Sequence, residues 1–330
     1  MTRSPTSKTP RRSTTSTTNL RAALRDCART GATQPALAKT ARLEALTRGF
    51  TRAQLELLLN SWTLWARLDQ LPPTAGQGGG VWKTWAIIGG RGAGKTRAGA
   101  EWVRGLALGL PGFADAPVER IALIGETAAD VREVMVEGVS GILSVHARHE
   151  KPRWEPSRRR LVWKTGTIAQ AFSAEEPESL RGPQFAAAWC DELAKWRRAE
   201  EVYDMLQFAL RLGERPRQLV TTTPRPIALL KRILADPLTA ISRAGTKKNA
   251  GNLAPDFLAE MMARYNGTRL GRQELDGEIV EDTPGALWTR ALIEAARVTK
   301  GRNVRENPWR CWNSALLRSR ILATLVISTR

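Results

Sequence analysis

The chain has 330 residues, of which 42% are hydrophobic and 25% charged, as in an ordinary globular protein. No apolar run reaches the roughly 18 residues of a membrane-spanning helix, and the basic, Ser/Thr-rich start does not have the pattern of a secretory signal. Three widely spaced cysteines and two histidines argue against a disulfide framework or a zinc site, and favour a reducing cytoplasm.

The net charge of +19 is concentrated at the two ends. Residues 1–30 hold seven Lys/Arg against one acid, and residues 297–330 hold eight against one. Basic ends of this kind suit nucleic acid, because they neutralise phosphates and release counterions. A solvated tail without a partner explains them equally well.

In chain order, residues 1–18 are low in complexity and predict a disordered basic tail. Residues 19–80 read as a helical segment that ends in a Pro/Gly loop, because apolar residues recur at helical spacing. Residues 81–250 predict the main core, residues 251–296 a helical linker, and residues 297–330 an atypical basic tail.

Within the core, strand-like and helix-like segments alternate, which indicates a mostly parallel sheet flanked by helices. Two apolar runs around 164–166 predict an inserted β-hairpin over 161–173. The expected strands are 84–89, 120–125, 185–191 and 218–222, and the expected helices are 96–110, 127–136 and 199–211.

The first of these strands leads into a glycine-rich phosphate-binding loop. The loop fits G-x-x-x-x-G-K-[ST] at every fixed position, and its residues are Gly89, Gly90, Arg91, Gly92, Ala93, Gly94, Lys95 and Thr96. The glycines let backbone N–H groups point at phosphate oxygens, and the following helix adds a partial positive charge. Lys95 would reach the β- and γ-phosphates of ATP, and Thr96 would hold Mg²⁺.

A second expected strand ends in two acids, Asp191 and Glu192. Asp191 can orient Mg²⁺, and Glu192 can take a proton from the attacking water while it stays ionised. The spacing leaves room for an intervening strand and helix. It therefore predicts a P-loop NTPase of the additional-strand, RecA-like type.

Three separated segments resemble the large terminase subunit of tailed bacteriophages, in the prophage and gene-transfer-agent type. They are GGRGAGKTRAGAEWVR, FSAEEPESLRGPQFAAAWCDELAKW and TTTPRP. The resemblance runs from about residue 50 to about residue 296. It implies an ATP-driven motor that packages double-stranded DNA into a procapsid, working with a portal ring and a small terminase subunit. It also implies a homo-oligomeric ring when active, and a location in the bacterial cytoplasm and at the portal.

The resemblance carries over to several residues. Gln70 resembles an adenine-recognising glutamine, and Thr221, Thr222 and Thr223 resemble a motif that couples hydrolysis to DNA movement. The plainer interpretation of Gln70 is an exposed linker glutamine, and that of the three threonines is a simple strand end.

Two arginines are candidates for stabilising charge on the transferred phosphoryl group. Arg91 lies in the loop and could act within its own subunit. Arg181 resembles an arginine that some terminases insert into a neighbouring subunit's site. The sequence does not choose between them, and a surface or salt-bridge role fits each as well.

The resemblance weakens toward the end of the chain. The family's nuclease domain needs several carboxylates for two metal ions, but Glu306 is the single acid after Val298. The acidic segment 275–282 reads as a linker. We therefore expect the nuclease domain to be missing and no DNA cleavage. A catalytically inert remnant and an ATP-dependent helicase-like protein are the alternatives to a packaging motor.

Overall fold

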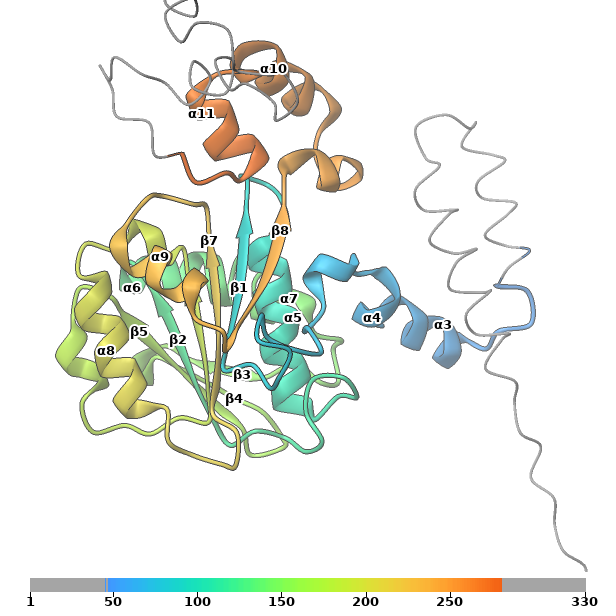
Figure 1. Cartoon of the computed structure of the whole chain (residues 1–330). Coiled ribbons are helices and arrows are strands. Elements are labelled where there is room, and N and C mark those ends of the chain that lie inside the picture. The colour runs from blue at the N-terminus through green and yellow to red at the C-terminus, as the bar shows by residue number, and fades with distance from the viewer. Residues whose placement is uncertain (1–44, 46, 281–330) are drawn as a thin grey trace, which may run out of the picture. The chain divides into compact units, whose positions relative to one another are not determined.

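The computed structural model describes Ala45 and residues 47–280 (Figure 1). The expected tail over 1–18, the helices expected over 19–44 and the tail over 297–330 lie outside these residues. The described residues belong to one compact unit. Within the described part, no helix is both long and apolar enough to cross a membrane.

An eight-stranded sheet forms the core, in the order β3-β4-β5-β2-β6-β7-β1-β8. Six strands are parallel, while β3 and β4 form an antiparallel hairpin that joins the edge of β5. The strands are β1 (Thr84–Gly89), β2 (Arg120–Gly125), β3 (Arg153–Glu155), β4 (Arg160–Val162), β5 (Ile168–Ser173), β6 (Ala187–Asp191), β7 (Arg217–Thr222) and β8 (Thr239–Ala244).

Strand β7 lies between β1, which leads into the glycine-rich loop, and β6, which ends in the acids. Strand β7, which was predicted over 218–222, is therefore the additional strand of this fold type, and the RecA-like α/β fold is confirmed. The hairpin predicted over 161–173 is also confirmed, because β4 and β5 pair antiparallel there. Strands β3 and β8 were not predicted.

Helices pack on both faces of the sheet (Figure 1). On one face, α5 covers a cluster rich in tryptophan, with Trp85, Trp102 and Trp189 fully buried. On the other face, α8 and α9 cover β2, β6 and β7. The helices are α3 (Arg52–Leu59), α4 (Trp62–Trp65), α5 (Lys95–Leu108), α6 (Ala128–Asp130), α7 (Ile142–Val145), α8 (Ala199–Ala209), α9 (Ala228–Ala235), α10 (Pro255–Tyr265) and α11 (Arg269–Gly271).

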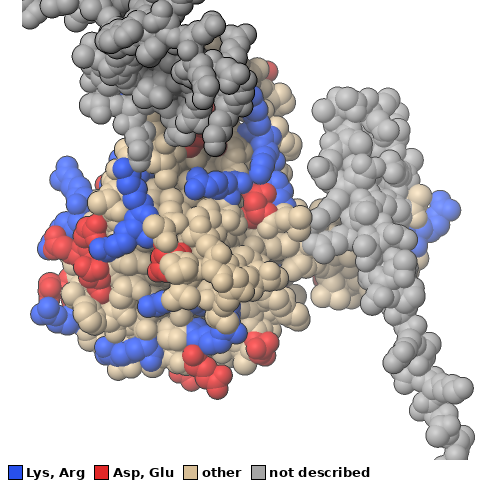
Figure 2. All heavy atoms as spheres, viewed as in Figure 1, with Lys and Arg blue, Asp and Glu red and all other residues tan. Residues whose placement is uncertain are grey.

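Charged side chains of both signs are mixed on the surface. On the face shown in Figure 2, basic and acidic side chains lie beside one another around a broad uncharged area. Typical pairs join Arg232 to Glu200 and Arg198 to Glu201. Such exposed pairs contribute little to stability, so the buried sheet and its two apolar layers hold the fold together.

Candidate nucleotide site

The glycine-rich loop connects β1 to α5 at the carboxyl edge of the sheet. Gly92 and Gly94 adopt left-handed backbone conformations, with φ of 72° and 86°. Residues with a Cβ avoid this region, so the motif's glycines are needed for the loop to curl back before α5 begins at Lys95. The N–H groups at the start of α5 make this end of the helix suitable for an anion.

The Lys95 amine joins the ends of three strands. Its Nζ donates to the backbone oxygens of Gly89 at 3.1 Å and Gly90 at 3.2 Å, and to Thr223 Oγ1 at 3.0 Å. Glu192 Oε1 lies 3.3 Å from the same nitrogen. The lysine side chain is 6% exposed, so this contact set fixes the ammonium group at the base of the loop.

The two acids after β6 have different surroundings. Asp191 is buried, and its Oδ1 accepts a hydrogen bond of 2.5 Å from Thr221 Oγ1. Burial, together with the neighbouring Glu192 carboxylate, raises the pKa of Asp191 to about 7. Glu192 is partly exposed and has a left-handed backbone, with φ of 50°. This conformation turns its carboxylate toward the loop and β7, where Oε2 accepts from the Thr223 N–H at 2.9 Å.

All three threonines at the end of β7 contact the segment that carries the acids. Thr221 bonds Asp191, and Thr223 Oγ1 donates to Glu192 Oε1 at 3.4 Å while accepting from Lys95. Thr222 Oγ1 accepts from the Ala194 N–H at 3.1 Å. The structure thus brings the loop, the acidic pair and the Thr segment into one hydrogen-bonded group.

Gln70 also lies at the loop. Its Nε2 donates to the Gly94 oxygen at 3.1 Å, and its Oε1 accepts from the Arg67 N–H at 3.2 Å. Gln70 is buried, so it is not the exposed linker residue of the plainer interpretation. Its adenine-reading role stays a prediction, because both polar atoms of the amide are engaged with the backbone.

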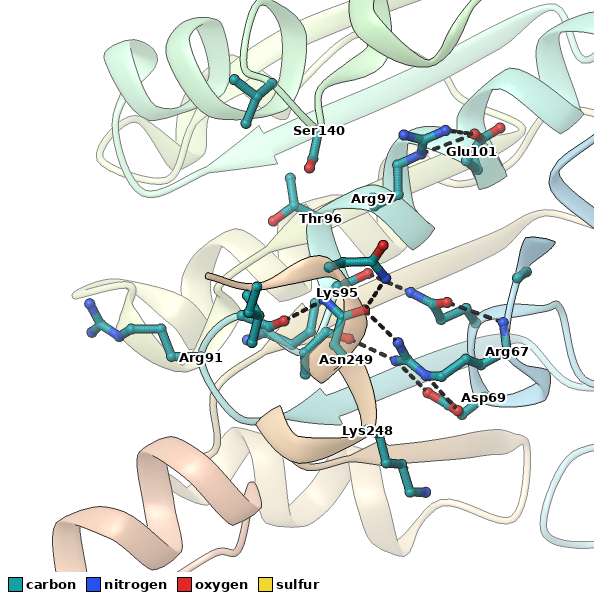
Figure 3. A pocket seen from close by; sticks show the side chains of 18 of the residues that line it. Arg67, Asp69, Arg91, Lys95, Thr96, Arg97, Glu101, Ser140, Lys248 and Asn249 are labelled. Carbon is teal, nitrogen blue, oxygen red and sulfur yellow. Dashed lines mark hydrogen bonds and ion pairs between the residues drawn. The ribbon is translucent and has the colours of Figure 1, made fainter. Parts of the chain in front are cut away.

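Sequence reasoning missed two contacts of the loop. Arg67 donates to the Ala93 oxygen at 2.7 Å and to Asn249 Oδ1 at 2.9 Å, and Asn249 Nδ2 donates to the Gly92 oxygen at 2.7 Å (Figure 3). Arg67 and Asn249 are 182 residues apart, and neither lies in a motif. No local signal in the sequence marks them.

The segment after β8 packs on the loop. Thr246 Oγ1 donates to the Arg91 oxygen at 2.7 Å, and the Arg91 N–H donates to the Glu274 oxygen at 2.6 Å. The residues just before and within the expected linker therefore form part of the wall around the phosphate loop.

These elements enclose a cavity of about 1910 Å³. Its lining includes the loop from Arg91 to Thr96, Gln70, Glu192, Thr223 and residues 247–253. Asp191 does not belong to the lining and lies buried behind Glu192.

The two candidate arginines lie apart from the Lys95 group. The Arg91 side chain is 77% exposed, lies 3.4 Å from Glu274, and points away from Lys95 (Figure 3). The Arg181 side chain is 71% exposed, pairs with Glu178 at 3.1 Å, and does not line the cavity. Within this single chain, neither guanidinium is placed beside Lys95.

The donor set fits a magnesium nucleotide. Backbone N–H groups and the Lys95 ammonium suit phosphate oxygens, and the hard oxygens of Thr96 and Asp191 suit Mg²⁺. Among the described residues, no group of three or more His, Cys, Asp or Glu could hold a metal ion by itself.

Comparisons with known proteins agree with this arrangement. The family described as "Terminase large subunit, T4likevirus-type, N-terminal" matches residues 86–295, which is more than half of the chain. A search of curated proteins gives no significant match.

The chain is also similar to solved structures of phage terminases. The large terminase of a thermophilic bacteriophage is 14% identical, covers 71% of this chain and 54% of its own, and superposes with a TM-score of 0.50. The Thermus phage P74-26 large terminase ATPase domain is 17% identical, with coverages of 70% and 98% and a TM-score of 0.49. The HK97 bacteriophage large terminase is 15% identical, with coverages of 70% and 50% and a TM-score of 0.44. At 14% identity, the structure with a TM-score of 0.50 speaks for the fold alone, and the family match over residues 86–295 decides the assignment. The chain belongs to the large terminase subunit family.

Proposed function

We propose that this chain is the ATPase motor of a phage terminase, which hydrolyses ATP to drive double-stranded DNA into a procapsid. The observation that carries the proposal is the contact of Thr223 with both Lys95 and Glu192. This contact links Lys95, which would bind phosphate, and Glu192, which would activate water, to the end of a different strand, β7. Loss of the γ-phosphate can therefore move the backbone that follows β7.

In the proposed reaction, Lys95 holds the β- and γ-phosphates and Glu192 orients the attacking water. The water oxygen bonds to the γ-phosphorus, the bond from that phosphorus to the β,γ-bridging oxygen breaks, and Glu192 takes the water's proton. Mg²⁺, held by Thr96 and Asp191, would neutralise charge on the phosphates when bound. ADP and inorganic phosphate are the products.

The Lys95–Glu192 pair suggests how the site is kept inactive without a nucleotide. Without a nucleotide, the Glu192 carboxylate is engaged with the Lys95 ammonium group at 3.3 Å. Phosphates compete for Lys95, so a bound nucleotide would release Glu192 toward the water. Loss of the γ-phosphate would restore the pair and pull on Thr223.

The proposal includes the setting of the reaction. The partners are double-stranded DNA, a portal ring and a small terminase subunit, and the active form is a homo-oligomeric ring. The protein works in the cytoplasm of the bacterial host and transiently at the portal of the procapsid. Gln70 contributes to the adenine side of the site, and Thr221, Thr222 and Thr223 couple hydrolysis to DNA movement.

A steady-state ATPase assay with nucleotide binding measured in parallel tests the proposal. We expect Glu192→Gln to lower turnover by about 10² or more while nucleotide binding remains, because it removes the base and leaves the loop intact. Lys95→Ala should lose both turnover and nucleotide binding, since it removes the phosphate contact. Arg215→Ala, at an exposed position outside the cavity, serves as the control and should match the wild type. Absence of any turnover in the wild type would favour an inert remnant instead, and turnover that DNA does not stimulate would contradict the motor role.

A further inference from the structure

The β3–β4 hairpin at the sheet edge carries a surplus of positive charge. Residues 148–164 contain seven Lys/Arg and two acids, Glu150 and Glu155. Both acids are committed to ion pairs. Glu155 binds Arg160 at 2.7 Å and Arg153 at 2.6 Å, and Glu150 binds Arg104 of α5 at 2.7 Å.

These pairs leave other cations of the hairpin without a counter-charge. Arg148, Lys151, Arg158 and Arg159 are exposed, and within the described part of the chain none of them has an ion pair. Glu155 instead fixes the side chains of Arg153 and Arg160 on the strands. The hairpin therefore presents ordered arginines beside free ones.

One face of the hairpin reaches solvent, with the Arg153 side chain 74% exposed and the Arg160 side chain 26% exposed. Glu155 of β3 lies opposite Arg160 of β4, and Arg160 lies opposite Gln170 of β5, so these residues share one face of the sheet. Arg153 shares this face as well, because it is two residues from Glu155 on the same strand. The opposite face, with Leu161 and Ala169, is buried in the core under α5. The apolar layer under α8 and α9 reaches Phe172 of β5 and includes no residue of β3 or β4.

The turn of the hairpin faces the carboxyl edge of the sheet. Arg159 accepts a backbone hydrogen bond of 2.8 Å from Ala171, near the end of β5, and β5 runs parallel to β2 and β6. The turn with Arg158 and Arg159 is thus on the same edge as Glu192, with β5 and β2 between them.

We propose that the β3–β4 hairpin binds the phosphate backbone of double-stranded DNA, with Arg158 and Arg159 as its main contacts. The inference rests on the proposed function, in which DNA is the polymer that is moved. A duplex carries one negative charge per about 1.7 Å of its axis, so a strand and turn lined with unpaired cations complement it.

The composition of the hairpin surface favours DNA over an acidic protein partner. Protein interfaces are anchored by large apolar or aromatic side chains in their centre. None of the exposed large hydrophobic side chains in the described part of the chain falls within residues 148–164. The surface offers charge and guanidinium donors, which are the groups that contact phosphates.

Fluorescence anisotropy of a labelled duplex of about 30 base pairs, titrated with the full chain at several salt concentrations without nucleotide, tests the inference. We expect Arg158→Ala/Arg159→Ala to weaken binding roughly tenfold at low salt and to reduce the salt slope by about 1.8, for two lost phosphate contacts. Arg158→Lys/Arg159→Lys should recover most of the affinity and most of the salt slope, because phosphate contacts accept any well-placed cation.

A charge-matched control separates the hairpin from the general basicity of the chain. Lys83→Ala/Arg215→Ala removes two exposed cations outside the hairpin, next to β1 and β7. It should leave the slope nearly unchanged. Equal effects of the two double variants, or wild-type binding by the hairpin variant, would overturn the inference.

ATP turnover distinguishes the two proposals. The hairpin variants should keep the basal ATPase rate and lose its stimulation by DNA. If the wild type binds DNA through the hairpin but never hydrolyses ATP, the proposed function fails and the binding surface stands. If the wild type is a DNA-stimulated ATPase and the hairpin variants are stimulated equally, the surface fails and the function stands.

Discussion

At the scale of single residues, the neighbouring acids Asp191 and Glu192 are suited to different tasks. Asp191 is buried with one carboxylate oxygen bonded to Thr221, whereas Glu192 reaches the cavity. The buried acid is the harder of the two to ionise, so its charge depends on what binds beside it. Its protonation should therefore control magnesium binding near neutral pH.

We expect the apparent affinity for Mg²⁺ to fall as the pH drops below 7. The pKa of Asp191 is raised to about 7, and magnesium requires the ionised carboxylate. Below this pKa the affinity should decrease by up to about tenfold per pH unit, and above it the dependence should level off. The measurement is the Mg²⁺ concentration that gives half-maximal nucleotide-dependent binding at pH 6, 7 and 8.

Two variants give the direction of the shift. Thr221→Val removes a hydrogen bond that favours the ionised form of Asp191, so the pH profile of the Mg²⁺ affinity should move to higher pH. Glu192→Gln removes a negative charge next to Asp191 and should move this profile to lower pH. In the absence of ligand the same group destabilises the fold as pH rises from about 4 to 7, because its folded-state pKa exceeds the unfolded value. A flat Mg²⁺ profile between pH 6 and 8 would contradict the assignment.

At the scale of elements, α5 and β6 approach closely at one glycine. A Cβ on Gly99 would lie 2.2 Å from Trp189 Cε2 and 2.6 Å from its Nε1. Trp189 Nε1 in turn donates to Thr221 Oγ1 at 2.8 Å, and Thr221 bonds Asp191. The contact between helix and strand therefore supports the geometry of the acid.

We expect Gly99→Ala to destabilise the protein by about 1–3 kcal/mol, measured by urea unfolding followed by tryptophan fluorescence. Alanine favours a helix over glycine by about 1 kcal/mol, so a net loss would show that the clash outweighs propensity. Gly80→Ala is the control, because a Cβ there meets nothing within 4 Å. Equal or greater stability of Gly99→Ala would mean that Trp189 relocates without cost.

The sequence predicted the elements whose signals are local. Strands β1 and β2 were predicted with the bounds that the structure shows, because each is an apolar run next to a turn signal. Strand β8 was missed, since TAISRA contains neither an apolar run nor a regular alternation and is held as a strand by its pairing with β1. Strand β3 is three residues long and is defined by its pairing with β4.

The same distinction applies to the site. The loop at Lys95 and the acids at Asp191 and Glu192 are contiguous motifs, so their chemistry could be read from the sequence. The contacts of Arg67 and Asn249 with the loop arise from tertiary packing between distant segments. Periodicity and spacing hold no information about such pairs.

At the scale of the whole molecule, the position of Arg181 suggests a site completed by a second subunit. Its side chain is exposed, pairs with Glu178 of its own 3-10 turn, and lies outside the cavity. Exposed pairs of this kind are weak and can break at little cost. The proposed action of Arg181 in a neighbouring subunit's site would therefore require only that this exposed pair break.

We expect Arg181→Ala to abolish turnover and spare ATP binding, and we expect activity to return when Arg181→Ala subunits are mixed with Glu192→Gln subunits. Each variant alone lacks one group, but in a mixed assembly the Glu192→Gln chain supplies Arg181 to a neighbour whose Glu192 is intact. ATP turnover as a function of the mixing ratio measures this, with a maximum at intermediate ratios. Mixing Lys95→Ala with Glu192→Gln is the control and should restore nothing, because both residues belong to the same subunit's site. Normal turnover by Arg181→Ala alone would remove this residue from the mechanism, and an inactive variant without recovery on mixing would place its role within its own subunit.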